Sequence, residues 1–253
     1  GSCPYYVPAS GKTPWTISIT YSTNVWSDGI NYILTSTASD KVGNISSPAT
    51  VCFYYDNSPA SATITFPLST GPTSGYYLKS ALGSFAGVVL DTTPVPSGFM
   101  SGINQIRLAL RRTTDNRWWT GSAWQVAQTY FSTTSYNTGT GVWGYSMPSR
   151  YTNLDDATTY FLSVQVQDTA GNWMLRGSTM SFVVDESSPT VGLTTPGTDG
   201  GSYQFFSTIR GTAADPNGFA LKVTSISISN PGVGCWDGIS AFTQSCPYYL
   251  TVT

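Results

Sequence analysis

Apolar and polar residues alternate with a period of two along several short segments of the chain. In residues 160–167, the sequence Tyr-Phe-Leu-Ser-Val-Gln-Val-Gln places every second side chain on one apolar face. The same alternation occurs in residues 60–66, 106–111 and 179–184. This period is typical of β-strands that bury one face.

Turn-forming residues separate these segments. Glycine, proline and asparagine gather at residues 91–98, 120–121, 139–141 and 170–172. No window of 11 residues carries the apolar pattern of a helix. Short strands punctuated by glycine and proline predict an all-β fold of the β-sandwich type.

Part of this strand pattern occurs twice. Residues 15–40 align with residues 143–168 without a gap, at an offset of 128. The matched pairs include Asp28 with Asp156, Tyr32 with Tyr160, Gly43 with Gly171 and Asn44 with Asn172. One inserted residue later, Asp56 matches Asp185 and Pro67 matches Pro196. Internal repeats of this kind indicate the domain organisation.

The other part of the pattern is also duplicated. Residues 117–124 recur as residues 235–242, and Gly87–Asp91 recurs loosely as Gly211–Asp215. Residues 3–10 return as residues 246–253, which defines a period of 243. The repeats predict a complete unit over 58–186, the back half of a preceding unit over 1–57, and the front half of a following unit over 187–253.

The two predicted halves suggest how the chain is completed. Alone, each half would expose a raw sheet edge and an apolar face, which folded proteins avoid. We predict that the front half of one segment completes a sandwich with the back half of the next. The link is either covalent, within one long polypeptide, or strand complementation between subunits. The repeated eight-residue stretch favours the covalent form, because separate subunits would not need that strand twice.

Composition narrows the class of protein. Of the 253 residues, 9% are charged and 14% are aromatic, and a chain with so many aromatic residues and such clear alternation is not disordered. No run approaches the roughly 18 apolar residues that a membrane helix needs. A formal net charge of −2 argues against nucleic acid as a partner.

Catalytic chemistry finds little support. The chain has no histidine, which removes the commonest general base and His-led zinc sites. Glu186 is the only glutamate. Asp155 and Asp156 are adjacent, so on a strand they would point to opposite faces rather than flank one bond. We predict that the protein is not an enzyme.

Several motifs together resemble a known family. Residues 154–160 look like the tyrosine-corner approach to a penultimate strand, with Trp26 and Tyr32 as counterparts. The strand that follows ends in residues 168–172, which residues 40–44 echo. With the Trp-Thr-Gly and Trp-Asp-Gly hairpins, these motifs resemble the bacterial Ig-like repeats strung along large secreted and cell-surface proteins.

The resemblance covers essentially the whole chain. It implies tandem Ig-like antiparallel β-sandwich units, cut in mid-unit at both ends, in an extracellular protein. The chain lacks the inter-sheet cysteine pair that antibody-type domains place around a central tryptophan. Because such folds host many functions, the resemblance says little about a ligand.

Carboxylates gather near the predicted unit junctions and fit two interpretations. In one, Asp40 and Asp168 cap backbone N–H groups in hairpin turns while the following Gly and Asn take left-handed conformations. In the other, hard oxygen ligands bind calcium between units, and no other cofactor is predicted. The calcium candidates are Asp56, Asp168, Asp185 and Glu186, with Asn57, Asp91 and Asp199 as further ligands.

Tryptophans cluster around one hairpin and its repeat. They are Trp118, Trp119, Trp124 and Trp236. Two consecutive tryptophans cannot both face the core from a regular strand, so one is expected to be exposed. Core packing, a contact between subunits and a platform for sugar rings all remain open.

Four cysteines suggest disulfides in an oxidising, extracellular setting. Cys235 and Cys246 flank the Trp-Asp-Gly turn, where a bond between them would close a hairpin. The 243-residue period places the equivalent partner of Cys3 before residue 1, which leaves Cys52 unpaired. A bond between Cys3 and Cys52 is the rival arrangement.

These observations predict a structural and adhesive segment of an extracellular filament or giant surface protein. Its expected partners are copies of itself or adjacent repeats, joined head to tail, with surface glycans as a further candidate. The alternative functions are a glycan-binding adhesin module, which grips sugars with the aromatic hairpin, and a spacer in a secreted hydrolase.

Overall fold

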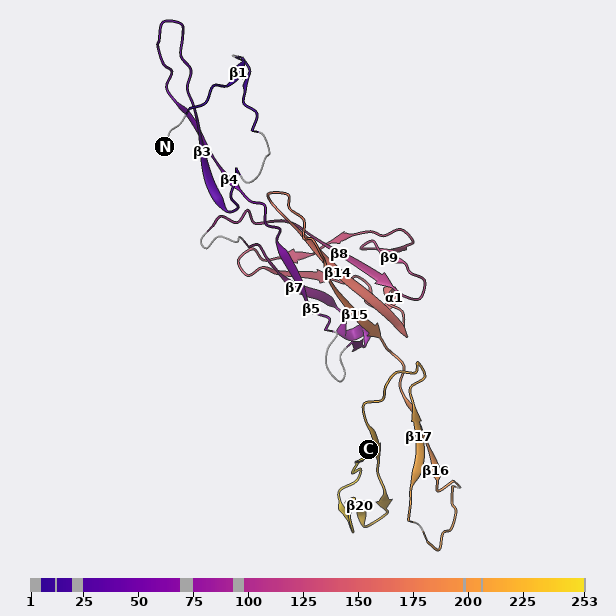
Figure 1. Cartoon of the computed structure of the whole chain (residues 1–253). Coiled ribbons are helices and arrows are strands. Elements are labelled where there is room, and N and C mark those ends of the chain that lie inside the picture. Colours follow the sequence, from indigo (N-terminus) through magenta and orange to yellow (C-terminus); the bar gives the residue numbers. More distant parts are fainter. Residues whose placement is uncertain are drawn as a thin grey trace. The chain divides into compact units, whose positions relative to one another are not determined.

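The protein is described from a computed structural model, which covers residues 6–11, 13–19, 25–68, 75–92, 98–197, 199–205 and 207–252. Strands make up its architecture (Figure 1). The helical elements in these residues are α1 (Arg150–Asn153) and the 3₁₀ turn η1 (Lys79–Ala81). In the described part of the chain, no helix is long and apolar enough to cross a membrane. The predicted all-β fold class is confirmed.

One sheet of the central region has four antiparallel strands. Their order is β12 (Ser135–Tyr136), β13 (Val142–Ser146), β7 (Ser84–Leu90) and β5 (Ser61–Phe66). In this register Trp143 lies opposite Gly87. A Cβ atom at Gly87 would lie 2.0 Å from the Thr63 carbonyl oxygen and 2.4 Å from the Trp143 ring. Only glycine therefore lets this tryptophan pack against the sheet.

The second sheet of the central region has seven strands. Its order is β10 (Trp124–Gln125), β9 (Trp118–Trp119), β8 (Ile103–Arg112), β14 (Thr158–Asp168), β15 (Ser178–Val184) and β6 (Tyr76–Tyr77). The seventh strand, β11 (Phe131–Ser132), pairs with β8. The pairing of β6 with β15 is parallel, which departs from the purely antiparallel units that the sequence predicts.

The apolar faces of the two sheets form a buried core, as the alternation predicts. The four-stranded sheet buries Phe85, Trp143 and Tyr145, and β14 buries every second residue. Contacts cross from one sheet to the other: Trp119 Nε1 donates a hydrogen bond to the Tyr145 hydroxyl at 2.9 Å, and the Phe131 and Tyr145 rings lie 4.6 Å apart. The sandwich-like arrangement is therefore confirmed.

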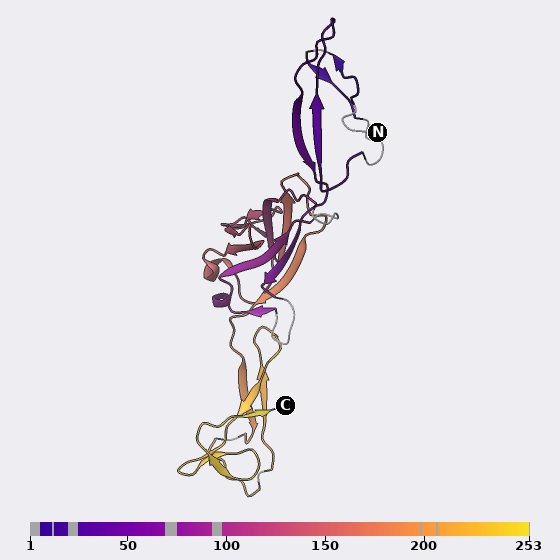
Figure 2. The ribbon, with the colours of Figure 1, turned by 90° about the vertical axis from the view of Figure 1, so that its left-hand side faces the viewer.

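Before the central region, four strands form two separate hairpins. They are β1 (Ser10–Gly11) with β2 (Trp15–Thr16), and β3 (Ile30–Ser36) with β4 (Ala49–Tyr55). The β3–β4 hairpin is clear in both views (Figure 1, Figure 2). It presents its strands as a two-stranded sheet with no fully buried residue.

After the central region, the strands form three small sheets. They are β16 (Thr190–Thr195) with β17 (Arg210–Ala214), β18 (Thr224–Ile226) with β22 (Leu250–Val252), and β19 (Ser229–Asn230) with β20 (Gly234–Trp236) and β21 (Phe242–Gln244). Figure 2 shows this region in the second view. Its sheets do not join into a larger one.

Internal packing divides the chain into two compact units, each discontinuous in sequence. The first comprises Gly1–Leu68, Ser84–Pro148 and Phe161–Met180. The second comprises Ser69–Gly83, Ser149–Tyr160 and Ser181–Thr253. These borders follow packing rather than the sequence repeat, so the predicted units 1–57, 58–186 and 187–253 stay a prediction.

Candidate functional site

Three aspartates from three separate segments bring their carboxylates together in the first compact unit. Asp56 follows β4, Asp91 follows β7, and Asp168 is the last residue of β14. One oxygen of each lies within 4.8 Å of the other two. Asp168 is fully buried and Asp91 is 9% exposed. The sequence prediction named all three residues, and the structure shows that they form one cluster.

Backbone amides fix two of these carboxylates in place. The N–H of Ser101 donates to Asp56 Oδ2 at 2.9 Å, and the N–H of Gly102 donates to Asp91 Oδ2 at 2.7 Å. The other oxygen of Asp91, Oδ1, is buried and has no hydrogen-bond partner among the described residues. Within the same residues, no Lys or Arg forms an ion pair with the cluster. In the described part of the chain, no cationic side chain therefore offsets the charge of the three carboxylates.

The pKa of Asp91 reflects this environment. Burial raises the pKa of its carboxyl above the usual value, and the negative charges of Asp56 and Asp168 raise it further. The hydrogen bond from the Gly102 amide acts in the opposite direction. Desolvation and like charges both disfavour the ionised form of the Asp91 carboxyl.

Asp168 also holds a turn, and Asp40 holds an equivalent one. Asp168 accepts the N–H of Asn172 on Oδ1 and the Asn172 side-chain amide on Oδ2, both at 2.8 Å. Asp40 accepts the same two groups of Asn44 at 2.9 and 2.7 Å. The predicted capping interpretation is confirmed at both turns. The glycine before each asparagine is left-handed, with φ of 93° and 100°, but the asparagines are not.

A second set of hydrogen bonds is also duplicated between residues that the sequence repeat matches. Asp28 accepts the N–H of Asn57 at 2.7 Å and the hydroxyl of the following serine. Asp156 accepts the N–H of Glu186 at 2.7 Å and the hydroxyl of its following serine at 2.8 Å. Residues that the sequence repeat pairs thus make matching contacts at the end of β4 and at the end of β15.

The predicted calcium candidates Asp185 and Glu186 are not part of the cluster of three carboxylates, and calcium binding at these two residues stays a prediction. They lie in the second compact unit, where Asn217 links two of the carboxylates. Its side-chain amide donates to Asp185 Oδ1 at 3.1 Å and to Asp156 Oδ1 at 3.3 Å. The Glu186 carboxylate accepts the N–H of Lys79. Neutral donors therefore serve these carboxylates.

Both predicted tyrosine corners form. The Tyr160 hydroxyl accepts the N–H of Asp155 at 2.7 Å, and the Tyr32 hydroxyl accepts the N–H of Ser27 at 2.6 Å. In each case the tyrosine reaches back five residues along the chain. A hydroxyl bound to the backbone just upstream of the strand is the defining feature of this motif.

Matched residues differ in burial between the complete sandwich and the flanking strands. Leu162 in β14 is fully buried, whereas its counterpart Leu34 in β3 is 49% exposed. Ile64 in β5 is 7% exposed, whereas its counterpart Leu193 in β16 is 62% exposed. The same apolar face is therefore present in all three regions but is covered only in the central one.

An apolar groove runs between the small sheets that follow the central region. Its volume is about 820 Å³. Side chains from four different strands and from the residue before β17 line it: Val191, Leu193, Ile209, Ile226, Trp236 and Phe242. Large exposed apolar surfaces are uncommon on monomeric soluble proteins.

The tryptophans of the aromatic hairpin differ in burial. Trp119 is fully buried in the sandwich core, so it is not available to a glycan or a partner. Trp118 and Trp124 are half-buried, and the guanidinium groups of Arg111 and Arg112 lie 5.8 and 4.7 Å from their ring centroids. Trp236 lines the apolar groove. Of the two adjacent tryptophans, Trp119 faces the core while Trp118 is half-buried rather than exposed.

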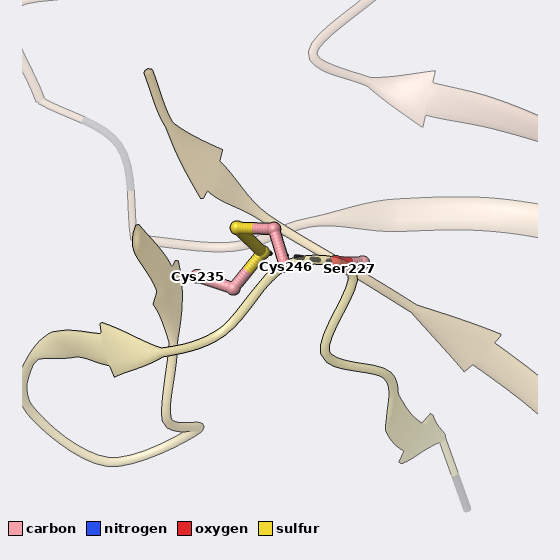
Figure 3. Close-up of a disulfide and its surroundings, with 3 residues drawn as sticks. All are labelled: Ser227, Cys235 and Cys246. Atoms are coloured by element: carbon pink, nitrogen blue, oxygen red, sulfur yellow. Dashed lines mark hydrogen bonds between the residues drawn. A yellow bond between two sulfur atoms is a disulfide. The ribbon is translucent and has the colours of Figure 1, made fainter. Parts of the chain in front are cut away.

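The predicted disulfide between Cys235 and Cys246 is present (Figure 3). It joins β20 to the segment after β21, with the Cα atoms 5.2 Å apart. The Ser227 hydroxyl lies 3.6 Å from Cys235 Sγ. Cys52 is exposed and, among the described residues, forms no disulfide. Cys3 lies outside the described residues, so the rival bond stays a prediction.

Comparison with known proteins gives little further guidance. No protein-family model matches the chain. No curated protein matches it. A solved structure described as a Ca²⁺-stabilized adhesin that helps an Antarctic bacterium reach out and bind ice is 16% identical, with a TM-score of 0.27. That similarity covers 64% of this chain and only 34% of the adhesin, and it is too slight to bear on fold or function.

Proposed function

We propose that this chain is a structural segment of an extracellular array of Ig-like sandwiches. In this array, the strands of residues 187–253 are completed by the equivalents of residues 7–57 from the next segment. The segment acts as a stiff spacer, and repetition multiplies its length. The adhesive role predicted from the sequence stays a prediction.

The strand orders of the central region support the Ig-like assignment. The strands can be named with the letters of the immunoglobulin fold. In the four-stranded sheet, β12, β13, β7 and β5 are then strands D, E, B and A, in that order. In the seven-stranded sheet, β8, β14 and β15 are strands C, F and G. These are the two sheets of the immunoglobulin fold. Two tyrosine corners at the start of the equivalents of strand F add to this support.

The flanking regions supply complementary sets of the same strands. The sequence repeat makes β16 and β17 equivalent to strands A and B, and β18 equivalent to strand C. It makes β2, β3 and β4 equivalent to strands E, F and G. In the central sandwich, strand E pairs with B and strand F is next to C in its sheet. Each flanking region therefore lacks the partners that the other region holds.

The observation that carries the proposal is the matched loss of burial. The apolar residues of β3 and of β16 are exposed at the positions where the central sandwich buries their counterparts. An exposed face and an unpaired edge are costly for a folded protein. Docking of the two halves would cover both faces. Each Å² of apolar surface removed from water would then contribute roughly 25 cal/mol of favourable free energy. The disulfide of the C-terminal strands supports an extracellular setting.

A lengthened chain tests this proposal. Because residues 250–253 correspond to residues 7–10, a second copy of residues 11–57 is attached after Thr253. In the lengthened chain, the added β2 should pair with the free edge of β17. We therefore expect hydrogen exchange at the β17 amides that do not bond to β16 to slow by roughly tenfold or more. The control carries Leu34→Asp in the added copy, which places a charge on the docking face. Equal exchange in the original, lengthened and control chains would contradict the proposal.

A further inference from the structure

We propose that Asp56, Asp91 and Asp168 together bind one Ca²⁺ ion. This inference does not rest on the proposed function, because all three residues belong to the first compact unit of a single chain. The site would be present whether or not the flanking strands are completed by a neighbour.

The geometry of the cluster fits one ion of the size of calcium. Oxygen ligands lie about 2.3–2.6 Å from Ca²⁺, so two oxygens on the same ion are at most about 5 Å apart. The three carboxylates each offer an oxygen within 4.8 Å of the other two. Magnesium binds oxygen at about 2.0–2.1 Å in a strict octahedron, which allows at most about 4 Å between ligands. Separations of at most 4.8 Å are compatible with calcium, and the magnesium arm of the experiment below tests the choice between the two ions.

The state of Asp91 gives an independent reason to expect a cation. Asp91 is only 9% exposed, and its buried Oδ1 atom has no hydrogen-bond partner among the described residues. A buried acceptor without a donor costs free energy, and a buried ionised carboxylate costs more. The Asp91 carboxylate lies beside those of Asp56 and Asp168, so a bound cation would supply the missing partner.

The second compact unit shows the alternative solution to the same problem. There the side-chain amide of Asn217 donates to both Asp156 and Asp185. Asp215, which the repeat matches to Asp91, accepts the N–H of Asn217 at 2.8 Å. Neutral donors thus reach the carboxylates of that site. Neutral groups also donate to the three carboxylates of the first unit, but none of the described groups donates to Asp91 Oδ1, and a cation would take that place.

Calcium at this position would join three segments of the chain. Asp56 directly follows β4, Asp91 follows β7 and Asp168 ends β14. The three carboxylates supply part of the six to eight oxygens that calcium takes, and water supplies the others. Binding would fix the connection between the β3–β4 hairpin and the central sandwich, because it ties residues on both sides of that connection to one ion.

Thermal unfolding of the full chain tests the assignment. The metal-free protein is melted with and without CaCl₂, with MgCl₂ in parallel, and the heat of binding is measured by calorimetric titration. At a hundredfold excess over the Kd, bound calcium should raise the Tm by about 5–10 °C. Asp91→Asn should abolish this rise. It should also melt higher than the wild type when both are metal-free, because it removes one of three repelling charges.

The matched control is Asp215→Asn, which changes the equivalent aspartate of the second unit. This variant should keep the full calcium response. Absence of a calcium effect on the wild type would overturn the proposal, as would an equal calcium response in Asp91→Asn. An equal response to magnesium would overturn the choice of calcium. Because the metal-free melting of Asp91→Asn is measured as well, a folding defect cannot be mistaken for loss of binding.

Discussion

The complete sandwich and the strands that flank it carry the same alternation but bury it to different extents. Ala62 in β5 is 3% exposed, while its counterpart Val191 in β16 is 73% exposed. The β5 residue has the opposite sheet above it, and the β16 residue faces an open groove. The comparison teaches that alternation determines which face of a strand is apolar, whereas burial of that face requires the partner sheet.

The two clusters of carboxylates differ in a similar way. In the second unit, Asn217 bridges Asp156 and Asp185 through its amide. In the first unit, Asp91 keeps a buried oxygen without a donor. The two clusters therefore differ in whether a side-chain amide links their carboxylates.

The largest expected effect comes from removing a matched leucine. Leu162→Ala should destabilise the protein by about 2–5 kcal/mol, because it leaves a cavity in the packed core. Leu34→Ala should cost less than about 1 kcal/mol, because this side chain is half-exposed already. Urea unfolding followed by tryptophan fluorescence measures both. Similar losses for the two variants would show that β3 is packed as tightly as β14.

A matched pair of glycines gives the next effect. Gly87→Ala should cost about 1–3 kcal/mol or more, because the new Cβ would meet the Thr63 carbonyl oxygen and the buried Trp143 ring. In Gly211→Ala the new Cβ would lie 2.4 Å from the Gly192 carbonyl oxygen. In the described part of the chain, β16 and β17 pair with no third strand, so this hairpin can adjust. Thermal melts of the two variants should therefore separate clearly. A larger loss for Gly211→Ala would contradict the comparison.

The two tyrosine corners offer a smaller contrast. Tyr160→Phe removes the acceptor of the Asp155 N–H and should cost about 1 kcal/mol. Tyr32→Phe removes the equivalent acceptor of the Ser27 N–H in a more open setting, where water replaces it, so only a few tenths of a kcal/mol should be lost. Chemical denaturation of the two single variants and of the double variant checks this order.

The smallest expected effect is a dependence on pH. Hydrogen bonding, chiefly from the Glu186 N–H, lowers the pKa of Asp156 below its usual value of 3.8. A lowered pKa in the folded state adds stability that is present above about pH 4 and lost as the pH falls through the folded value. Asp156→Asn should remove this part of the acid sensitivity. Urea midpoints between pH 2 and 6 that vary identically in wild type and variant would contradict it.

Much of the central fold could be predicted from sequence because its signals are local. Alternation in residues 160–167 identified the buried face of β14, and the spacing of Tyr160 from Asp155 placed the corner. The Cys235–Cys246 bond followed from two cysteines on either side of one turn. Each of these features depends on residues that are close together in the chain.

Features that depend on tertiary pairing were harder to predict. Asp56, Asp91 and Asp168 are far apart in sequence, and only the register of three strand ends brings them together. The role of Asn217 was missed, since nothing near it marks an amide that bridges two carboxylates. The sequence also could not show which of Trp118 and Trp119 is buried. The strand that contains them has only two residues, which is too short to show an alternation.

The parallel strand β6 was also missed. Tyr76 and Tyr77 are too short a segment to show alternation, and their pairing with Val183 and Val184 joins residues more than a hundred positions apart. Short strands at a sheet edge carry little sequence signal, because few of their side chains are buried.

Disulfide trapping in the lengthened chain tests the completion of the flanking strands most directly. In the central sandwich Gly144 lies opposite Ala86, and the repeat matches these residues to Thr16 and Arg210. With Cys3 and Cys52 changed to serine, Thr16→Cys in the added copy and Arg210→Cys should oxidise to one bond, since opposed residues on antiparallel strands lie within disulfide reach. Thr212→Cys, two residues along, should trap poorly. Equal trapping at both positions, or none at either, would contradict the proposed register.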